Sequence, residues 1–85
     1  MTTFEPGDLI ELASNTRHYL VKRVWNPRFK RFTYKPSGTV SPGDKLVILF
    51  EEFPFFFVLG QKESGFFGSL GMSVAFKKLN VDEET

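Results

Sequence analysis

The sequence predicts an all-β fold, a small barrel of five to six short antiparallel strands. Five Pro and seven Gly residues are spread along the 85-residue chain, and they interrupt it too often for long helices. The runs between them are rich in Val, Ile, Phe and Tyr, which favour strands. Aromatic residues form 16% of the chain, and large rings suit a small barrel that few side chains must fill.

Six strands are expected from these runs, at about residues 8–13, 19–25, 28–34, 45–51, 55–60 and 72–76. Residues 46–50 are apolar throughout, which is typical of a central strand covered on both faces. Met72, Val74 and Phe76 alternate with smaller residues, as in a half-buried strand. Turns are expected at Asn26-Pro27 and at residues 63–65.

A helix over residues 8–26 is the alternative for the first part of the chain. This window lacks Pro and Gly, and Leu9, Leu12, Ala13, Thr16, Leu20 and Val24 fall roughly on one helical face. Its β-branched residues and the turn-like Ser14-Asn15-Thr16 favour strands instead. We therefore predict strands and retain the helix as the competing interpretation.

One tripeptide occurs twice ahead of an apolar run, as Pro6-Gly7-Asp8 and as Pro42-Gly43-Asp44. Pro fixes φ, Gly permits a positive φ and Asp caps the turn, so each can direct the chain into a strand. A second apolar run follows each at the same offset. The pattern suggests a barrel of two similar halves, although such turns are also common before single strands.

With the segment Gly65-Phe66-Phe67-Gly68-Ser69-Leu70-Gly71 and a short strand ending at Lys77-Lys78-Leu79, this layout resembles that of SH3-like small barrels. The resemblance covers residues 4–81 in pattern and implies the fold. It does not imply the ligand, because the acidic loop and paired aromatics of peptide-binding SH3 domains are missing and the long loop is basic. Barrels of this kind also occur as stand-alone phage proteins, so the resemblance is compatible with a viral source.

Length and composition predict one domain over residues 1–85, with a short acidic tail at 82–85. The absence of Cys favours a reducing compartment. Residues 1–6 lack the features of a signal peptide, and the most apolar stretch, residues 46–59, is interrupted by Glu51, Glu52 and Pro54. We therefore expect no membrane association and a cytoplasmic location, which is the host cytoplasm if the protein is viral.

The sequence gives no support for catalysis. His18 is the one histidine, and no acidic residue lies between Leu12 and Gly43 to orient it. Glu51 and Glu52 are adjacent in a predicted strand and point to opposite faces. The glycines of residues 65–71 lack the Lys and helix of a phosphate loop and are expected to form turns, with Phe66 and Phe67 packing at the barrel end. We expect no enzyme activity, no metal and no cofactor.

The strongest signal is the basic, aromatic segment of residues 17–35. All seven basic residues between Leu12 and Gly43 lie in it, and aromatic rings separate them. Cations that neutralise phosphates beside rings that stack on bases are typical of nucleic-acid binding. The predicted binding residues are Arg17, Lys22, Arg23, Trp25, Arg28, Lys30, Arg31, Tyr34 and Lys35.

Read as two strands, this segment places Arg28 and Lys30 on one face and Lys22 with Val24 on another, so the cations do not all converge. Docking on an acidic protein surface, as a viral inhibitor or virion component would, is the alternative function. A solvated hairpin with aromatics in the core is the structural alternative.

The segment Phe53-Pro54-Phe55-Phe56-Phe57 is a second candidate surface. Alternation places Phe56 opposite Phe55 and Phe57, so both faces of this strand are apolar. Either the fold covers both faces, or one face contacts a second copy and forms a homodimer.

Overall fold

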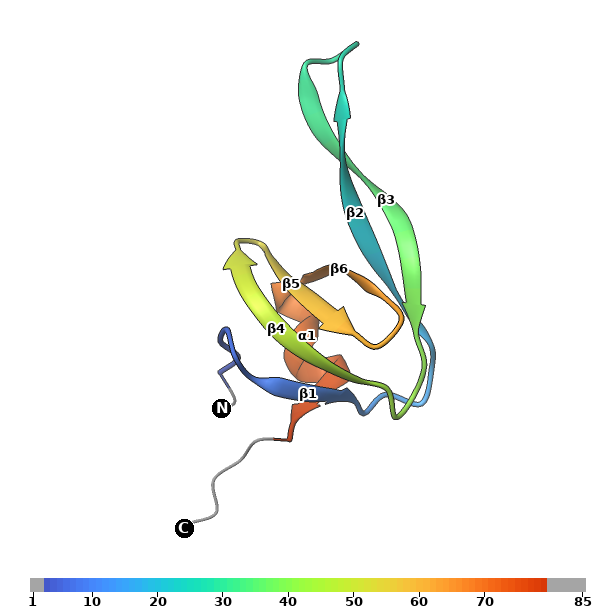
Figure 1. Ribbon diagram of the computed structural model, residues 1–85, viewed down its shortest axis with the longest axis vertical. Coiled ribbons are helices and arrows are strands. Elements are labelled where there is room, and N and C mark those ends of the chain that lie inside the picture. The colour runs from blue at the N-terminus through green and yellow to red at the C-terminus, as the bar shows by residue number, and fades with distance from the viewer. Residues whose placement is uncertain (1–2, 80–85) are drawn as a thin grey trace.

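The computed structural model describes residues 3–79 and confirms an all-β fold. Its strands form a single antiparallel sheet in the order β3-β2-β6-β5-β4-β1-β7 (Figure 1). The elements are β1 (Leu9–Leu12), β2 (His18–Asn26), β3 (Arg31–Val40), β4 (Lys45–Glu52), β5 (Phe55–Gly60), β6 (Ser64–Gly68), α1 (Ser69–Ala75) and β7 (Phe76–Lys78). The sheet has seven strands rather than five or six, and β3 and β7 are its free edges, so it is not a closed barrel.

The first five predicted strands all occur. The helix alternative for residues 8–26 is wrong, because β1 and β2 occupy this window and pair with β4, β7, β3 and β6. The predicted third strand begins later than expected, at Arg31. Lys30 adopts a φ of 52°, which belongs to a turn and not to a strand, and Arg28 lies in the same turn.

The end of the sheet differs from the prediction in two elements. Residues 64–68 form strand β6, although their Ser and Gly residues suggested a turn. Residues 69–75 form the short helix α1, where a strand was predicted over 72–76. Met72 and Ala75, three residues apart, face the core while Val74 is exposed, so the burial follows a helical period and not the alternation of a strand.

The two Pro-Gly-Asp tripeptides form the same turn. Gly7 and Gly43 have φ values of 95° and 92°, which a side chain would disfavour. Asp8 Oδ2 accepts a hydrogen bond from the Glu5 amide at 2.8 Å, and Asp44 Oδ2 accepts one from the Ser41 amide at 2.9 Å. The predicted turn is therefore confirmed twice.

The two halves that follow these turns are not alike. β4 pairs with the next strand, β5, whereas β1 pairs with β4 and β7 and does not pair with β2. The same turn therefore precedes two strands that pair differently, and the expectation of a barrel made of similar halves is wrong.

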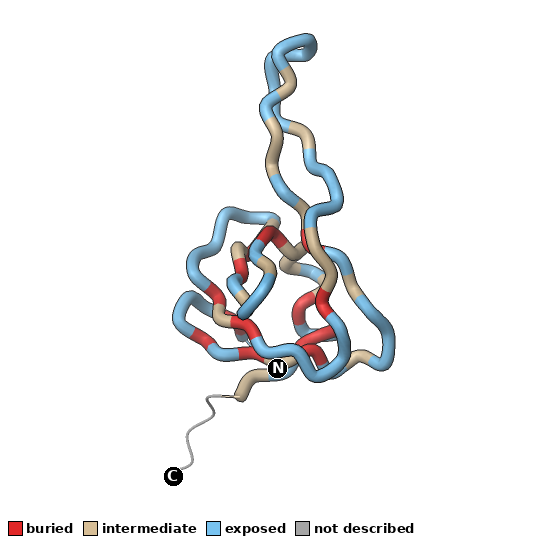
Figure 2. The backbone as a smooth tube through the Cα atoms, turned by 45° about the vertical axis from the view of Figure 1, so that its right-hand side comes forward, coloured by how far each residue is buried: buried red, intermediate tan, exposed pale blue. Residues whose placement is uncertain are grey.

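The hydrophobic core lies between the curved sheet and α1 (Figures 1 and 2). Its most deeply buried side chains are Ile10, Leu12, Leu20, Ile48, Met72, Val40 and Val58. Among residues 3–79, no helix has the length and apolar character needed to cross a bilayer.

The β2–β3 hairpin continues past this core and gives the molecule its elongated shape, 52 × 22 × 21 Å (Figure 1). Leu20 and Val40 are buried at its root. Beyond them, residues 21–36 form a projecting ribbon, here called the arm, that is exposed or half-buried throughout (Figure 2). One backbone pairing, Val21 with Phe66, joins the arm to the body of the sheet.

Candidate functional site

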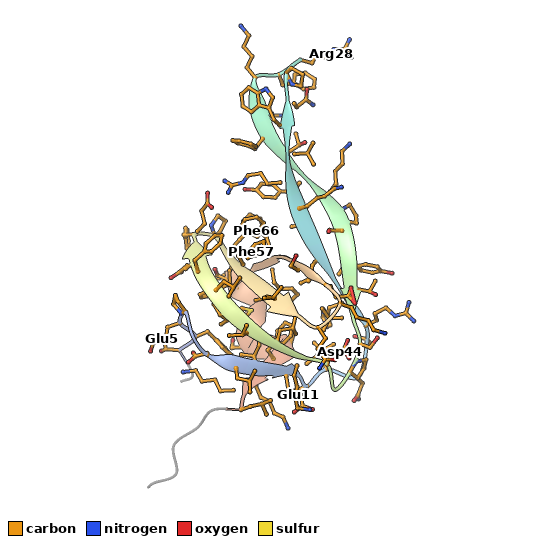
Figure 3. The ribbon with its side chains drawn as sticks, in the orientation of Figure 1. Glu5, Glu11, Arg28, Asp44, Phe57 and Phe66 are labelled. Carbon is orange, nitrogen blue, oxygen red and sulfur yellow. The ribbon has the colours of Figure 1, made fainter. Side chains whose placement is uncertain are left out.

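The outer end of the arm is a turn built around Asn26. The Asn26 side-chain oxygen accepts hydrogen bonds from the amides of Arg28 at 3.0 Å and Phe29 at 3.4 Å. Lys30, with its positive φ, completes the reversal into β3. Residues 28–30 therefore belong to the turn at the apex, and Figure 3 shows Arg28 at the end of the arm farthest from the core.

Along its strands, the arm places its cations other than Arg23 on one face and its aromatic rings on the other. Cross-strand partners share a face of a ribbon, and the faces alternate along each strand. Lys22 pairs with Lys35 on one face. The neighbouring pairs Arg23 with Tyr34 and Trp25 with Phe32 lie on the other.

The predicted binding residues are thus divided by position. Lys22, Lys35 and Arg31 lie on the cationic face, and Lys22 shares it with Val24 as predicted. Arg28 and Lys30 lie at the apex. The predicted strand over residues 28–34 would have placed both on one strand face, but β3 begins only at Arg31. Arg17 precedes β2 at the root of the arm.

Most of these cations have no charged partner. Within the described part of the chain, Arg23 is the one basic residue of the segment 17–35 that forms an ion pair. The other ion pairs of residues 3–79 join Lys77 to Glu11 and Lys78 to Asp8, both on the body. Six basic side chains, those of Arg17, Lys22, Arg28, Lys30, Arg31 and Lys35, thus keep their charge uncompensated.

Arg23 connects the arm to the end of β4. Its Nη2 donates to Glu52 Oε1 at 2.7 Å, and its Nη1 donates to Oε2. The hydrogen bond from Arg23 lowers the pKa of Glu52 below its ordinary value. The guanidinium also lies over the rings of Phe32 and Phe66, at 5.1 and 5.2 Å.

The rings on this side of the arm continue across the sheet as an aromatic face. Register places Val21, Phe66 and Phe57 in one row across β2, β6 and β5, and Phe50 of β4 is the next partner of Phe57. Phe50 and Phe57 stack at 5.0 Å, and Phe57 meets Phe66 edge-on at the same distance (Figure 3). The aromatic face consists of Trp25, Phe32, Tyr34, Phe50, Phe55, Phe57 and Phe66.

Tyr34 is the ring through which the arm packs on the body. Its ring centroid lies 4.6 Å from that of Phe55 and 6.4 Å from that of Phe66. Trp25 contacts Phe32 at 5.1 Å and remains 51% exposed. Of the two rings predicted to stack on bases, Trp25 is the freer one.

The candidate self-association residues are divided between the two sides of β5. Phe56 is buried in the core, while Phe55 and Phe57 belong to the aromatic face and are half-buried. Phe53, in the turn before them, is 79% exposed. A second copy would therefore meet Phe53, Phe55 and Phe57 and would not reach Phe56.

Sequence reasoning missed Phe50 and Glu52 as members of this surface. Leu46 and Ile48 face the core, so alternation predicts that Phe50 does too. The register shifts between Ile48 and Phe50, and this bulge turns Phe50 onto the aromatic face. No residue in β4 is of a type that predicts the bulge.

His18 lies against an aromatic ring. The His18 ring is half-buried and meets the edge of Phe67 at 5.9 Å, consistent with a place at the rim of the core. Within residues 3–79 no three His, Asp or Glu side chains lie close enough together to hold a metal ion.

No protein-family model, curated protein or solved structure matches the chain.

Proposed function

We propose that this protein binds nucleic acid through the arm and catalyses no reaction. The observation that carries the proposal is the set of six basic side chains that form no ion pair within residues 3–79 and lie on one projecting hairpin and its root. Each cation that contacts a phosphate releases condensed counterions, and this release supplies most of the affinity of non-specific binding.

The two faces of the arm suggest separate roles. Lys22, Lys35 and Arg31 would contact the phosphate backbone from the cationic face, and Arg28 and Lys30 from the apex. Contacts to the backbone fix position and carry no sequence information, so the binding is expected to be largely independent of sequence. Trp25 is exposed enough to stack on a base, whereas Tyr34 is engaged with Phe55.

The test is the salt dependence of binding to a short DNA or RNA. Replacing Arg28, Lys30 and Arg31 by Ala should lower the slope of log affinity against log salt by about one unit for each phosphate that is no longer neutralised. The matched control replaces Lys45, Lys62 and Lys77, three exposed cations of the body, and removes the same net charge. An equal fall in affinity in both variants, or no binding by the wild type at low salt, would refute the proposal.

Docking of a protein is the second candidate function, and the aromatic face favours it. Trp25, Phe32, Tyr34 and Phe50 are each more than 40% exposed on one continuous side of the sheet. An acidic partner would meet the arm cations, and a second copy would meet Phe53, Phe55 and Phe57. Recovery of one protein and no nucleic acid in a pull-down, abolished by Phe53→Asp, would favour this candidate.

Kinship with SH3-like small barrels, a viral source and a cytoplasmic location are also proposals. They rest on the pattern of turns and strands in the sequence, on its basic long loop and on the lack of Cys. The open edges at β3 and β7 leave closure of the barrel unsupported.

A further inference from the structure

The apex of the arm presents an aromatic ring that the rest of the molecule does not cover. Phe29 is 61% exposed. Its one cation–π or ring–ring contact within residues 3–79 is with the Arg31 guanidinium, 5.6 Å from the ring centroid. Two further exposed rings lie next to the apex along the arm, on the cross-strand partners Trp25 and Phe32. These rings meet edge-on at 5.1 Å and are 51% and 52% exposed. Single exposed rings are ordinary on protein surfaces, but three among eight consecutive residues concentrate apolar surface at one point.

Cations surround the apex ring, and the turn fixes their positions. Arg28 and Lys30 are its neighbours in sequence, and the Asn26 side chain holds the amides of Arg28 and Phe29. No acidic residue lies between Leu12 and Gly43, so neither strand of the arm carries a negative charge that would repel a phosphate. The arm also provides reach, since five residues of β2 lie beyond Val21 and span roughly 17 Å.

A nucleic-acid duplex fits this shape better than a single strand. Two-stranded ribbons bind DNA in its major or its minor groove, and apolar wedges enter from the minor groove. The major groove of an RNA duplex, in contrast, is too narrow for side chains to read. Stacking along a single strand requires rings and cations on the same side. The register places Lys22 and Lys35 on the opposite face from Trp25 and Phe32.

On the premise that the proposed function holds, we propose that the ligand is double-stranded DNA and that Phe29 acts as a wedge between base pairs. The flanking cations hold the phosphates while the ring enters a base step. Proteins that insert apolar side chains in this way unstack the step and kink the duplex by roughly 20–90°. Pyrimidine–purine steps unstack most readily, so the arm should prefer a TA step.

The experiment measures bending and affinity together. A DNA duplex with a central TA step carries a donor and an acceptor fluorophore at its ends, and energy transfer reports the end-to-end distance. The wild type should raise the transfer to a value that corresponds to a bend of roughly 20–90°. Phe29→Ala should abolish the bend and weaken binding by roughly 5- to 150-fold, the usual range for removal of one base stack, with the salt slope unchanged.

Two variants control for unfolding and for a general decrease in surface apolarity. Leu70→Ala removes an exposed apolar side chain from α1 and should bend DNA as the wild type does. Phe29→Leu retains an apolar wedge and should restore much of the bend. Circular dichroism of Phe29→Ala should match the wild type, because the ring contributes nothing to the core.

Three results would overturn the wedge. These are duplex binding without a bend, an undiminished bend in Phe29→Ala, and a tighter affinity for a single strand of the same length than for the duplex. All three leave the proposed function standing. Failure to bind any DNA or RNA at low salt would refute the proposed function and the wedge together.

Discussion

Trp25 lies on a surface, although a lone tryptophan in so small a chain could have filled its core. It is 51% exposed and contacts Phe32 across the arm. We predict that Trp25→Ala changes the free energy of unfolding by no more than about 1 kcal/mol, because exposed positions away from the core tolerate truncation. Urea denaturation monitored by circular dichroism measures this change.

Phe56 provides the contrast on the same sheet. It is buried in the core, so Phe56→Ala should cost about 3–5 kcal/mol. For the same reason Phe56→Asp cannot serve as a test of self-association, since it would place an unpaired charge inside the fold. If Trp25→Ala were as costly as Phe56→Ala, the position of Trp25 on the arm would be wrong.

At the scale of elements, β6 depends on a glycine that lets β2 approach closely. Gly65 is buried, and a Cβ on it would lie 2.9 Å from Leu20 Cβ and 3.0 Å from the Val21 carbonyl oxygen. We predict that Gly65→Ala destabilises the fold by about 1–3 kcal/mol, the usual cost of overpacking. The root of the arm should loosen with it, which hydrogen exchange at β2 would detect.

Gly68→Ala is the matched control, since a Cβ at Gly68 meets nothing within 4 Å. Its φ of −63° suits any residue, but Gly68 is the N-cap of α1, where Ala is less favourable than Gly, so this variant should cost no more than about 1 kcal/mol. A Gly65→Ala variant as stable as Gly68→Ala would show that β2 and β6 can separate without cost.

The sequence predicts a strand whose own residues favour strand structure, and it misses elements whose conformation depends on packing against other parts of the fold. β5 begins and ends at the predicted residues, because its apolar run is bounded by Pro54 and by Gly60. β6 was read as a turn, because the small residues that β2 requires there are also turn residues. α1 was read as a strand, because five alternating residues do not distinguish a strand from a helix that buries Met72 and Ala75.

The same limit applies to the candidate site. The exposure of its cations could be predicted, because a run of basic residues without acids stays in solvent whatever the fold. The exposure of Trp25 could not, because an aromatic ring of this segment could equally have filled the core. The separation of cations from rings could not, because it depends on where β3 begins. Glu52 also escaped prediction, since its partner Arg23 lies 29 residues away along the chain.

At the scale of the whole molecule, the Arg23–Glu52 pair fixes the inner half of the arm against the body. Arg23 lowers the pKa of Glu52, so the folded state favours the carboxylate more than the unfolded chain does. This contribution is complete above the ordinary pKa of 4.5 and is lost as the pH falls through the lower folded value. We predict that the protection of the arm amides, measured as the exchange rate relative to that of an unfolded chain at the same pH, falls on acidification through that range.

Glu52→Gln separates this effect from the titration of the other carboxylates. The variant should exchange faster than the wild type at neutral pH, and the difference should vanish at low pH. High salt should reduce it too, because both side chains are partly exposed. No difference at neutral pH would mean that the packing of Tyr34 on Phe55, rather than the ion pair, holds the arm in place.

Leu20 and Gly38 are partners in register, so the chain leaves the body for the arm and returns to it at adjacent points. The core strands β1, β4, β5 and β7 form their ladders without any residue of the arm. A short turn joining residues 20 and 38 could therefore replace the arm and leave these ladders intact. Mutations can therefore change the length and composition of the segment between residues 20 and 38 without disturbing the core strands. Related chains are expected to differ most between these two residues.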